Sequence, residues 1–101
     1  MGIYTQNNFT HLGHIVLLIY KEMDNSELFD GFLTEFGKKV KKERESKGYT
    51  LDDLEFYTTI DSSDINKIEL GQRNITLKSL FKISQGLDIH PKELFNFNFI
   101  E

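Results

Sequence analysis

Apolar positions in the middle of the chain recur at helical spacing and divide it into short helices. In the segment from Ser62 to Leu70, Ile65 and Ile68 lie three residues apart and share one helix face. Asp61 precedes the segment as a capping residue, and Gly71 follows it as a residue able to take the left-handed conformation that ends a helix. The pattern predicts a helix of little more than two turns, which is too short to be stable alone.

A second short helix is predicted just before it, starting at Thr50. The Thr50 side chain can accept from the amide of Asp53 while the Asp53 side chain reaches back, which is an acidic variant of the capping box. The apolar positions expected to face inward are Leu51, Leu54 and Tyr57. The two helices start about ten residues apart, with Ile60 buried between them, and this is the spacing of a helix-turn-helix.

Helices are also predicted on both sides of this pair. The first runs up to Lys47 and stops before Gly48. Its inward positions are Phe29, Phe32, Leu33, Phe36 and Val40. After the pair, Thr76 caps a fourth helix. Its inward positions are Leu77, Leu80, Phe81, Ile83 and Leu87. Pro91 opens a short fifth helix, whose Leu94 and Phe95 are expected to close the core.

The two ends of the chain follow less regular patterns. Residues 1–30 form an extension of uncertain structure, whose apolar run Ile15–Tyr20 suits a strand or a short buried helix. Residues 1–22 are expected to be poorly ordered or used in self-association. At the other end, Asn96–Ile100 alternates apolar and polar positions like a strand. A dimer contact and packing onto the first helix would both cover these phenylalanines, so each end is a possible surface for a protein partner.

Composition limits the chain to one small domain and few kinds of chemistry. Its 101 residues and 39% hydrophobic content suit one helical core, expected over residues 31–101. Without cysteine, disulfides and thiolate metal sites are excluded, and a cytoplasmic location is expected. A membrane span needs about 20 apolar residues, and the longest run has six.

No arrangement of residues indicates catalysis, a cofactor or a metal. His11 and His14 could share a helix face, but a metal site usually needs three or four ligands, so packing or solvated histidines are favoured. Asp52 and Asp53 are better explained as favourable charge at a helix N-terminus than as an acid/base pair. The protein is therefore not expected to be an enzyme.

The run from Phe36 to Phe95 resembles the XRE type of helix-turn-helix, the family of phage repressors and Cro. The resemblance is carried by residues that match the family pattern of a basic first helix, a capped second helix and an Ile-x-x-Ile-Glu-x-Gly recognition helix. These are Gly48-Tyr49-Thr50, Leu54, Ile60-Asp61, Ile65-Asn66-Lys67-Ile68-Glu69-Leu70-Gly71 and Asn74-Ile75-Thr76-Leu77. The chain departs from the pattern at Glu55, where the family has a small residue, at Thr59, where it often has glycine, and at Leu51, where it often has a phosphate-binding glutamine.

This resemblance implies a compact all-α, five-helix domain that binds double-stranded DNA as a dimer and regulates transcription in a sequence-specific way. The recognition helix, at about residues 62–70, would enter the major groove. The positions expected to contact bases are Ser62, Ser63, Asn66 and Lys67. The positions expected to contact phosphate are Gln72, Arg73, Asn74, Thr76 and Lys78. Asp64 could accept from cytosine N4 or could cap the helix. Arg44 and Glu69 are implied to form a mainly structural pair.

The charge pattern also agrees with a second function. Sixteen acidic against twelve basic residues give a net charge of −4, which is unusual for a DNA-binding domain. The basic run from Lys38 to Lys47 could attract phosphate, but its interspersed glutamates favour an ordinary solvated face. The alternative is a protein-interaction module on the same fold, such as an antitoxin-like or antirepressor-like subunit. Leu51, Asp61 and Asp64 agree with that alternative.

Overall fold

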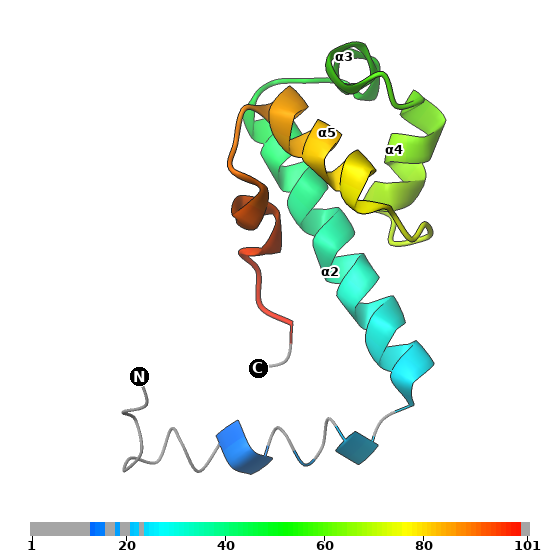
Figure 1. Ribbon diagram of the computed structural model, residues 1–101, viewed down its shortest axis with the longest axis vertical. Coiled ribbons are helices and arrows are strands. Elements are labelled where there is room, and N and C mark those ends of the chain that lie inside the picture. Colours follow the sequence, from blue (N-terminus) through cyan, green and yellow to red (C-terminus); the bar gives the residue numbers. More distant parts are fainter. Residues whose placement is uncertain (1–12, 16–17, 19–20, 23, 100–101) are drawn as a thin grey trace.

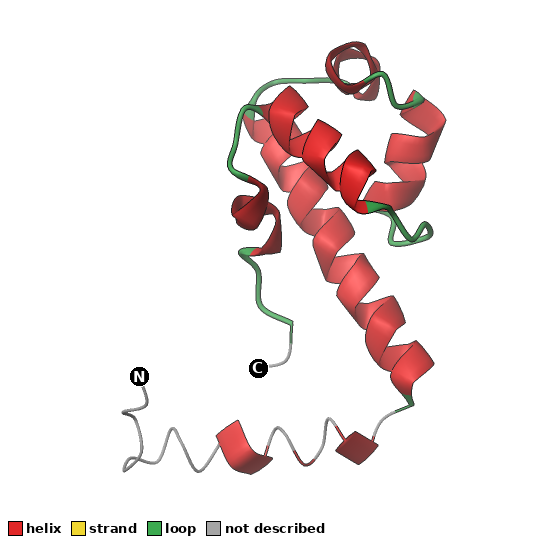
Figure 2. Ribbon diagram, viewed as in Figure 1, coloured by secondary structure: helices red, strands yellow, loops and turns green. Residues whose placement is uncertain are grey.

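The computed structural model describes residues 13–15, 18, 21–22 and 24–99. All regular structure in this part of the chain is helical, and Figure 2 shows no strand in it. The elements are α2 (Asn25–Ser46), α3 (Leu51–Thr58), α4 (Ser62–Glu69), α5 (Leu77–Leu87) and the 3₁₀ helix η1 (Pro91–Phe95). In Figure 1 the long α2 crosses behind α5, while α3 and α4 lie at one end of the molecule. The predicted all-α, five-helix architecture is confirmed.

Helix α2 is longer than the motif needs. Its first turn is capped by Asp24, whose side chain accepts from the amide of Ser26, and Gly48 follows its end with φ of 74°. The domain start expected at residue 31 therefore falls inside this helix. The N-terminal turns of α2 project beyond α5 (Figure 1).

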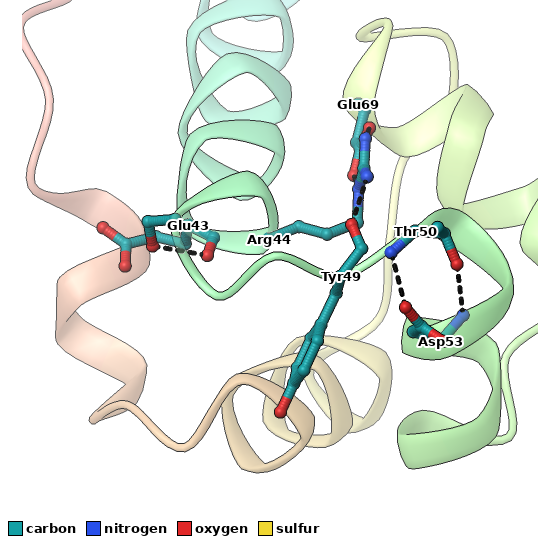
Figure 3. Close-up of polar contacts among 7 residues, drawn as sticks. Glu43, Arg44, Tyr49, Thr50, Asp53 and Glu69 are labelled. Carbon is teal, nitrogen blue, oxygen red and sulfur yellow. Dashed lines mark hydrogen bonds and ion pairs between the residues drawn. The ribbon is translucent and has the colours of Figure 1, made fainter.

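Two backbone features define α3 and its connection to α4. The predicted capping box is present, because the Thr50 amide donates to Asp53 Oδ2 at 2.8 Å and the Asp53 amide donates to Thr50 Oγ1 at 3.0 Å (Figure 3). Thr59 ends α3 in the left-handed region, with φ of 62°. Leu54 is buried as predicted, whereas the prediction that Tyr57 faces inward is wrong, since this residue is 52% exposed and lies on the outside of the helix.

The core lies where α2, α3, α4 and α5 meet. Its buried apolar members are Phe36, Val40, Leu54, Ile65, Ile68, Leu80, Ile83, Leu87 and Leu94. Two glycines allow helices to approach closely. A Cβ on Gly37 would overlap the carbonyl oxygens of Ile68 and Glu69 in α4, and one on Gly86 would lie 2.6 Å from the Thr58 methyl group in α3. Gly86 therefore brings α5 against α3, although a glycine inside a helix is less stable than alanine there.

The prediction for α5 is wrong at two of its five apolar positions. Leu80, Ile83 and Leu87 are buried, but Leu77 is 82% exposed and Phe81 is 53% exposed. These two residues lie four apart, on one edge of the helix. The apolar face of α5 is thus wider than the strip that the core covers.

The C-terminal residues pack on α2. Leu94 of η1 is buried, whereas Phe95 is 45% exposed and lies with its ring 5.5 Å from that of Phe36. Phe97 and Phe99 place their rings 5.6 Å and 5.5 Å from that of Phe32. The described part of the tail forms no strand, so the prediction of a strand-like segment at 96–100 is corrected. Its phenylalanines pack on the first helix, which is one of the two alternatives expected for them.

Little of the N-terminal extension can be compared with its prediction. Ile15 and Leu18 are helical, at 40% and 51% exposure, so neither belongs to a strand or a buried helix. The other residues of the run Ile15–Tyr20, and His11, lie outside the described residues, while His14 is exposed. Of the helices described, none has the length and apolar character that a bilayer crossing requires.

Candidate nucleic-acid interface

Helix α4 has one face in the core and one face in solvent. Ile65 is fully buried and Ile68 is 3% exposed, so their side chains fix the helix against the rest of the domain. The opposite face carries Ser63, Asn66 and Lys67, all of them exposed. The helix spans Ser62–Glu69, in agreement with the predicted recognition helix. Three polar side chains are thereby presented outward from a rigidly held backbone.

The start of α4 is capped by a residue from another helix. Asp61 occupies the N-cap position as predicted, but its side chain makes no capping hydrogen bond, so the predicted role is wrong. The amide of Ser62 instead donates to Glu55 Oε1 of α3 at 2.9 Å. Glu55 stands where the resembling family has a small residue, and that departure was the only hint of its role in the sequence. The contact ties the first turn of α4, which carries Ser62 and Ser63, to α3.

The end of α4 is tied to α2 by a buried ion pair. Arg44 Nε donates to Glu69 Oε2 at 2.7 Å, and Arg44 Nη2 donates to Glu69 Oε1 at 2.9 Å (Figure 3). The two side chains are only 10% and 3% exposed. Arg44 Nη1 also donates to the carbonyl oxygen of Tyr49 at 2.8 Å, so one guanidinium group joins α2, the loop before α3, and α4. The hydrogen bonds to Glu69 raise the pKa of Arg44 above its ordinary value.

Gly71 turns the chain out of α4 and into the loop that precedes α5. It has φ of 73°, and the amide of Gln72 donates to the carbonyl of Lys67 at 2.8 Å, which satisfies the end of the helix. Gln72, Arg73 and Asn74 are all exposed in the loop that follows. Thr76 is exposed too and caps α5, accepting from the amide of Ser79 at 3.1 Å. Lys78 is exposed in the first turn of α5.

A second ion pair links this loop to the first turn of α4. Arg73 Nη2 lies 3.1 Å from Asp64 Oδ1, with the two side chains 43% and 39% exposed. Asp64 thus holds an arginine in place and does not cap the helix. Lys67, by contrast, forms no ion pair within the part of the chain that the structure describes.

Two lysines of the basic run on α2 are paired with acidic neighbours. Lys39 Nζ lies 2.6 Å from Glu43 Oε2, and Lys38 Nζ lies 3.3 Å from Glu35 Oε2. The Lys38–Glu35 pair is solvated, as the interpretation of this run as an ordinary surface face requires, whereas the side chains of Lys39 and Glu43 are only 11% and 21% exposed.

Comparison with known families identifies the class of protein to which this geometry belongs. Residues 40–94, more than half of the chain, match the family model HTH_3, described as helix-turn-helix. The protein belongs to this helix-turn-helix family of DNA-binding transcriptional regulators, which is the family that the sequence resembles.

Individual relatives narrow the comparison to one kind of regulator. The chain is 38% identical over 66 residues to the control protein C.BamHI of Bacillus amyloliquefaciens, covering 64% of this chain and 82% of that protein. It is 39% identical over 62 residues to the control protein C.MunI of Mycoplasma sp, covering 60% and 84%. Both relatives are therefore matched over most of their length.

Solved structures of restriction-modification controller proteins are also similar to this chain. The restriction-modification controller protein C.AhdI from Aeromonas hydrophila superposes with a TM-score of 0.62 at 38% identity, covering 62% of this chain and 96% of that one. C.Esp1396I, solved as a tetramer on its natural 35-base-pair operator, superposes with a TM-score of 0.59 at 36% identity, covering 63% and 84%. More than a third of this chain therefore has no counterpart in either structure.

Proposed function

We propose that this protein is a transcriptional regulator of the restriction-modification controller type, which binds its operator as a dimer with α4 in the major groove. The observation that carries the proposal is the division of α4 into two faces. Ile65, Ile68 and Glu69 hold the helix in the domain, and the other face offers only hydrogen-bonding side chains. A short helix held in this way is what reading base edges requires, because base discrimination depends on side chains at fixed positions.

The residues proposed to contact bases are Ser62, Ser63, Asn66 and Lys67. Ser62 and Ser63 begin α4, while Asn66 and Lys67 lie in its second and last turn. In this class of fold the N-terminal residues of the recognition helix contact base edges. Lys67 can donate to guanine O6 and N7, Asn66 can pair with adenine, and serine can bond to several bases. Glu55 supports the serines from behind by its hydrogen bond to the amide of Ser62.

A separate group is proposed to contact phosphate. Its members, in the loop after α4 and the start of α5, are Gln72, Arg73, Asn74, Thr76 and Lys78. All are exposed, and the amides at the start of a helix favour anions. Arg73 exchanges the Asp64 carboxylate for a phosphate oxygen on binding, at small cost because both side chains are more than a third exposed.

We also propose which part of the chain binds DNA and where the protein acts. Residues 31–101 act as the DNA-binding unit, and the first turns of α2, residues 25–30, extend this unit toward the N-terminus. The protein has no catalytic activity and acts in the cytoplasm, where its operator lies.

One feature of the surface favours the alternative of a protein-interaction module. The start of α3, which often binds phosphate in relatives, carries the exposed Asp52 and Asp53 and the half-buried Leu51. These two carboxylates repel the phosphates of DNA, so the phosphate contact that relatives make here is lost. DNA binding by this chain would then depend on the loop after α4.

In-vitro selection from a random duplex pool tests the proposed function. We expect enrichment of a site with two related half-sites about one helical turn apart, and binding that weakens steeply with salt. Failure to enrich any sequence, together with no shift of random duplex at low ionic strength, would contradict DNA binding and favour the interaction module.

A further inference from the structure

A hollow of about 500 Å³ lies between the start of α3 and the start of α4. Its walls are formed by Arg44, Thr50, Leu51, Asp52 and Ser62. Ser62 is the first of the residues proposed to contact bases, and Leu51 lines the same hollow from the first position of α3. The hollow therefore lies beside the end of α4 that meets base edges in this class of fold.

Two of the polar walls are already engaged within the protein. Arg44 donates to Glu69 and to the carbonyl oxygen of Tyr49 (Figure 3). Thr50 Oγ1 accepts from the amide of Asp53 as part of the capping box. A ligand in the hollow cannot use these groups without a large cost, because breaking the contacts leaves a buried charge or a helix end without its partner.

Two other walls are available to a ligand, and they differ in chemistry. Leu51 is half-buried against the core and lines the hollow with the rest of its apolar side chain. The Ser62 amide donates to Glu55, while the Ser62 hydroxyl has no hydrogen-bond partner among the residues that the structure describes. An apolar group therefore lies beside a hydroxyl that is able to donate or to accept.

Asp52 determines which part of DNA suits the hollow. It lines the hollow and is exposed, so its carboxylate repels phosphate oxygens. The side chain of Leu51 has no hydrogen-bond donor to offer a phosphate either. The walls are therefore unsuited to the DNA backbone and fit the edge of an uncharged base.

Thymine is the base whose major-groove edge places an apolar group beside a hydrogen-bond acceptor. It presents its C5-methyl group next to O4, whereas cytosine presents an amino group and the purines present N7 with O6 or N6. We propose that Leu51 packs on the C5-methyl group of one thymine in each half-site, while the Ser62 hydroxyl donates to O4 of the same base. Leu51 is then a specificity-determining residue that lies outside the recognition helix.

This inference rests on the proposed function and deepens it, because it assigns one base to two named side chains. The capping box fixes the backbone at the start of α3, and the Glu55 contact ties Ser62 to the same helix. Leu51 and Ser62 thus keep their relative positions before DNA arrives, which discrimination of a single methyl group requires.

Replacing thymine with uracil in the operator tests the methyl contact directly, because the exchange removes only the methyl group. The duplex is the site that in-vitro selection yields for the full wild-type chain, and each thymine is exchanged in turn. At one thymine per half-site we expect the wild-type Kd to rise by about fourfold, as for one methyl group that is no longer withdrawn from water. A wild-type Kd that no exchange raises would overturn the inference.

Substitutions of Leu51 identify the side chain that contacts the methyl group. For each variant the Kd on the uracil duplex is divided by the Kd on the thymine duplex, so that any loss of folded protein affects both values equally. Leu51→Ala and the bulkier Leu51→Gln should each lower this ratio from about four to about one, whereas Leu51→Met, which stays apolar, should retain most of it.

Leu70→Ala is the matched control for Leu51→Ala. Leu70 is 55% exposed at the end of α4 and does not line the hollow, so this variant should keep the wild-type ratio. An unchanged ratio for both Leu51→Ala and Leu51→Gln, or an equal fall for Leu70→Ala, would show that Leu51 does not contact the methyl group.

The hydroxyl of Ser62 provides an independent check. Ser62→Ala removes the donor for O4, so selection with this variant should relax preference at the same base pair as selection with Leu51→Ala. Its ratio of uracil to thymine Kd should remain above that of Leu51→Ala, because the methyl contact is still present. Relaxation at two different base pairs would contradict the shared thymine.

Failure of this inference differs from failure of the proposed function. If selection yields a site that contains no thymine, or one whose thymines are all insensitive to loss of the methyl group, the protein reads DNA without this contact and only the inference fails. If the wild-type chain selects no sequence at all, the proposed function and the inference fail together.

Discussion

Helix α4 takes part in two ion pairs that differ in almost every respect. Glu69, at its end, meets Arg44 through two hydrogen bonds with side chains at 10% and 3% exposure. Asp64, near its start, meets Arg73 through one contact of 3.1 Å with side chains at 43% and 39% exposure. A buried pair is strongly destabilising when it is broken, whereas an exposed pair is worth little. The buried pair therefore fixes the C-terminal end of α4, whereas Arg73 in the exposed pair is free to exchange Asp64 for another partner.

This difference separates positioning from binding within one short helix. The buried pair keeps the backbone of α4 in place, and its arginine is not available to bind DNA. The exposed pair keeps an arginine beside the recognition helix at little cost, so phosphate can compete for it. The following predictions test this contrast, beginning with the largest expected effect.

Breaking the buried pair should have the largest effect on stability. Arg44→Ala or Glu69→Ala should each lower the free energy of unfolding by roughly 3–5 kcal/mol, because the remaining charge is buried without a partner. Urea titration followed by circular dichroism measures this, with Glu69→Gln as a milder variant of the same shape. In the double variant the losses should be far from additive. Additive losses would show that the two residues are not coupled and would remove the pair from the account.

Separating α2 from α4 should have the next largest effect. Gly37→Ala places a methyl group against the carbonyl oxygens of Ile68 and Glu69 and should cost roughly 1–3 kcal/mol through overpacking. Gly31→Ala, in the same helix, is the control. Its Cβ would lie 3.4 Å from Phe99 Cε1, an ordinary contact, so alanine should stabilise the helix by roughly 0.5–1 kcal/mol. Thermal unfolding of both variants checks the opposite signs, and the same sign for both would refute the close approach.

The cap of α4 should have an intermediate effect. Glu55→Ala removes the acceptor for the Ser62 amide and should cost about 1 kcal/mol, in the usual range for a helix cap. Asp61→Ala should cost much less, because the Asp61 side chain makes no capping bond. Glu55→Gln retains an acceptor oxygen and should recover most of the loss. A larger cost for Asp61→Ala than for Glu55→Ala would return the cap to Asp61.

The exposed pair should contribute least to stability. Asp64→Asn should change the free energy of unfolding by less than about 1 kcal/mol. The same change should strengthen binding to any duplex, since it removes a negative charge from the recognition helix and releases Arg73. Chemical unfolding and titration of a scrambled duplex measure the two effects. A destabilisation comparable with that of Glu69→Ala would erase the contrast between the pairs.

The sequence predicts those parts of the molecule that depend on local rules. The capping box at Thr50 and the left-handed glycines at positions 48 and 71 follow from residue types at fixed offsets. The end of α2, the start of α3 and the end of α4 could therefore be placed closely. The meeting of Arg44 with Glu69 came from the family resemblance. Neither residue has a local pattern that indicates its partner.

What the sequence does not predict depends on contacts between elements. The cap of α4 comes from Glu55 in α3, which no rule of spacing within α4 can indicate. Leu77 and Phe81 have the right spacing for the core, but periodicity only defines a face of a helix and not how much of it neighbours cover. Likewise the alternating tail becomes a set of ring contacts on α2, because α2 is long enough to receive it.

The central claim is that the exposed face of α4 reads bases while the loop after it holds phosphate. Comparing Lys67→Ala with Arg73→Ala, by salt titration on a selected and on a scrambled duplex, tests it most directly. Lys67→Ala should cost roughly 1–3 kcal/mol on the selected duplex and relax preference at one base pair, with little change on the scrambled one. Arg73→Ala should weaken both duplexes alike and make the slope of log K against log salt shallower by about one. Equal losses for the two variants on both duplexes would contradict the assignment of α4 to base recognition.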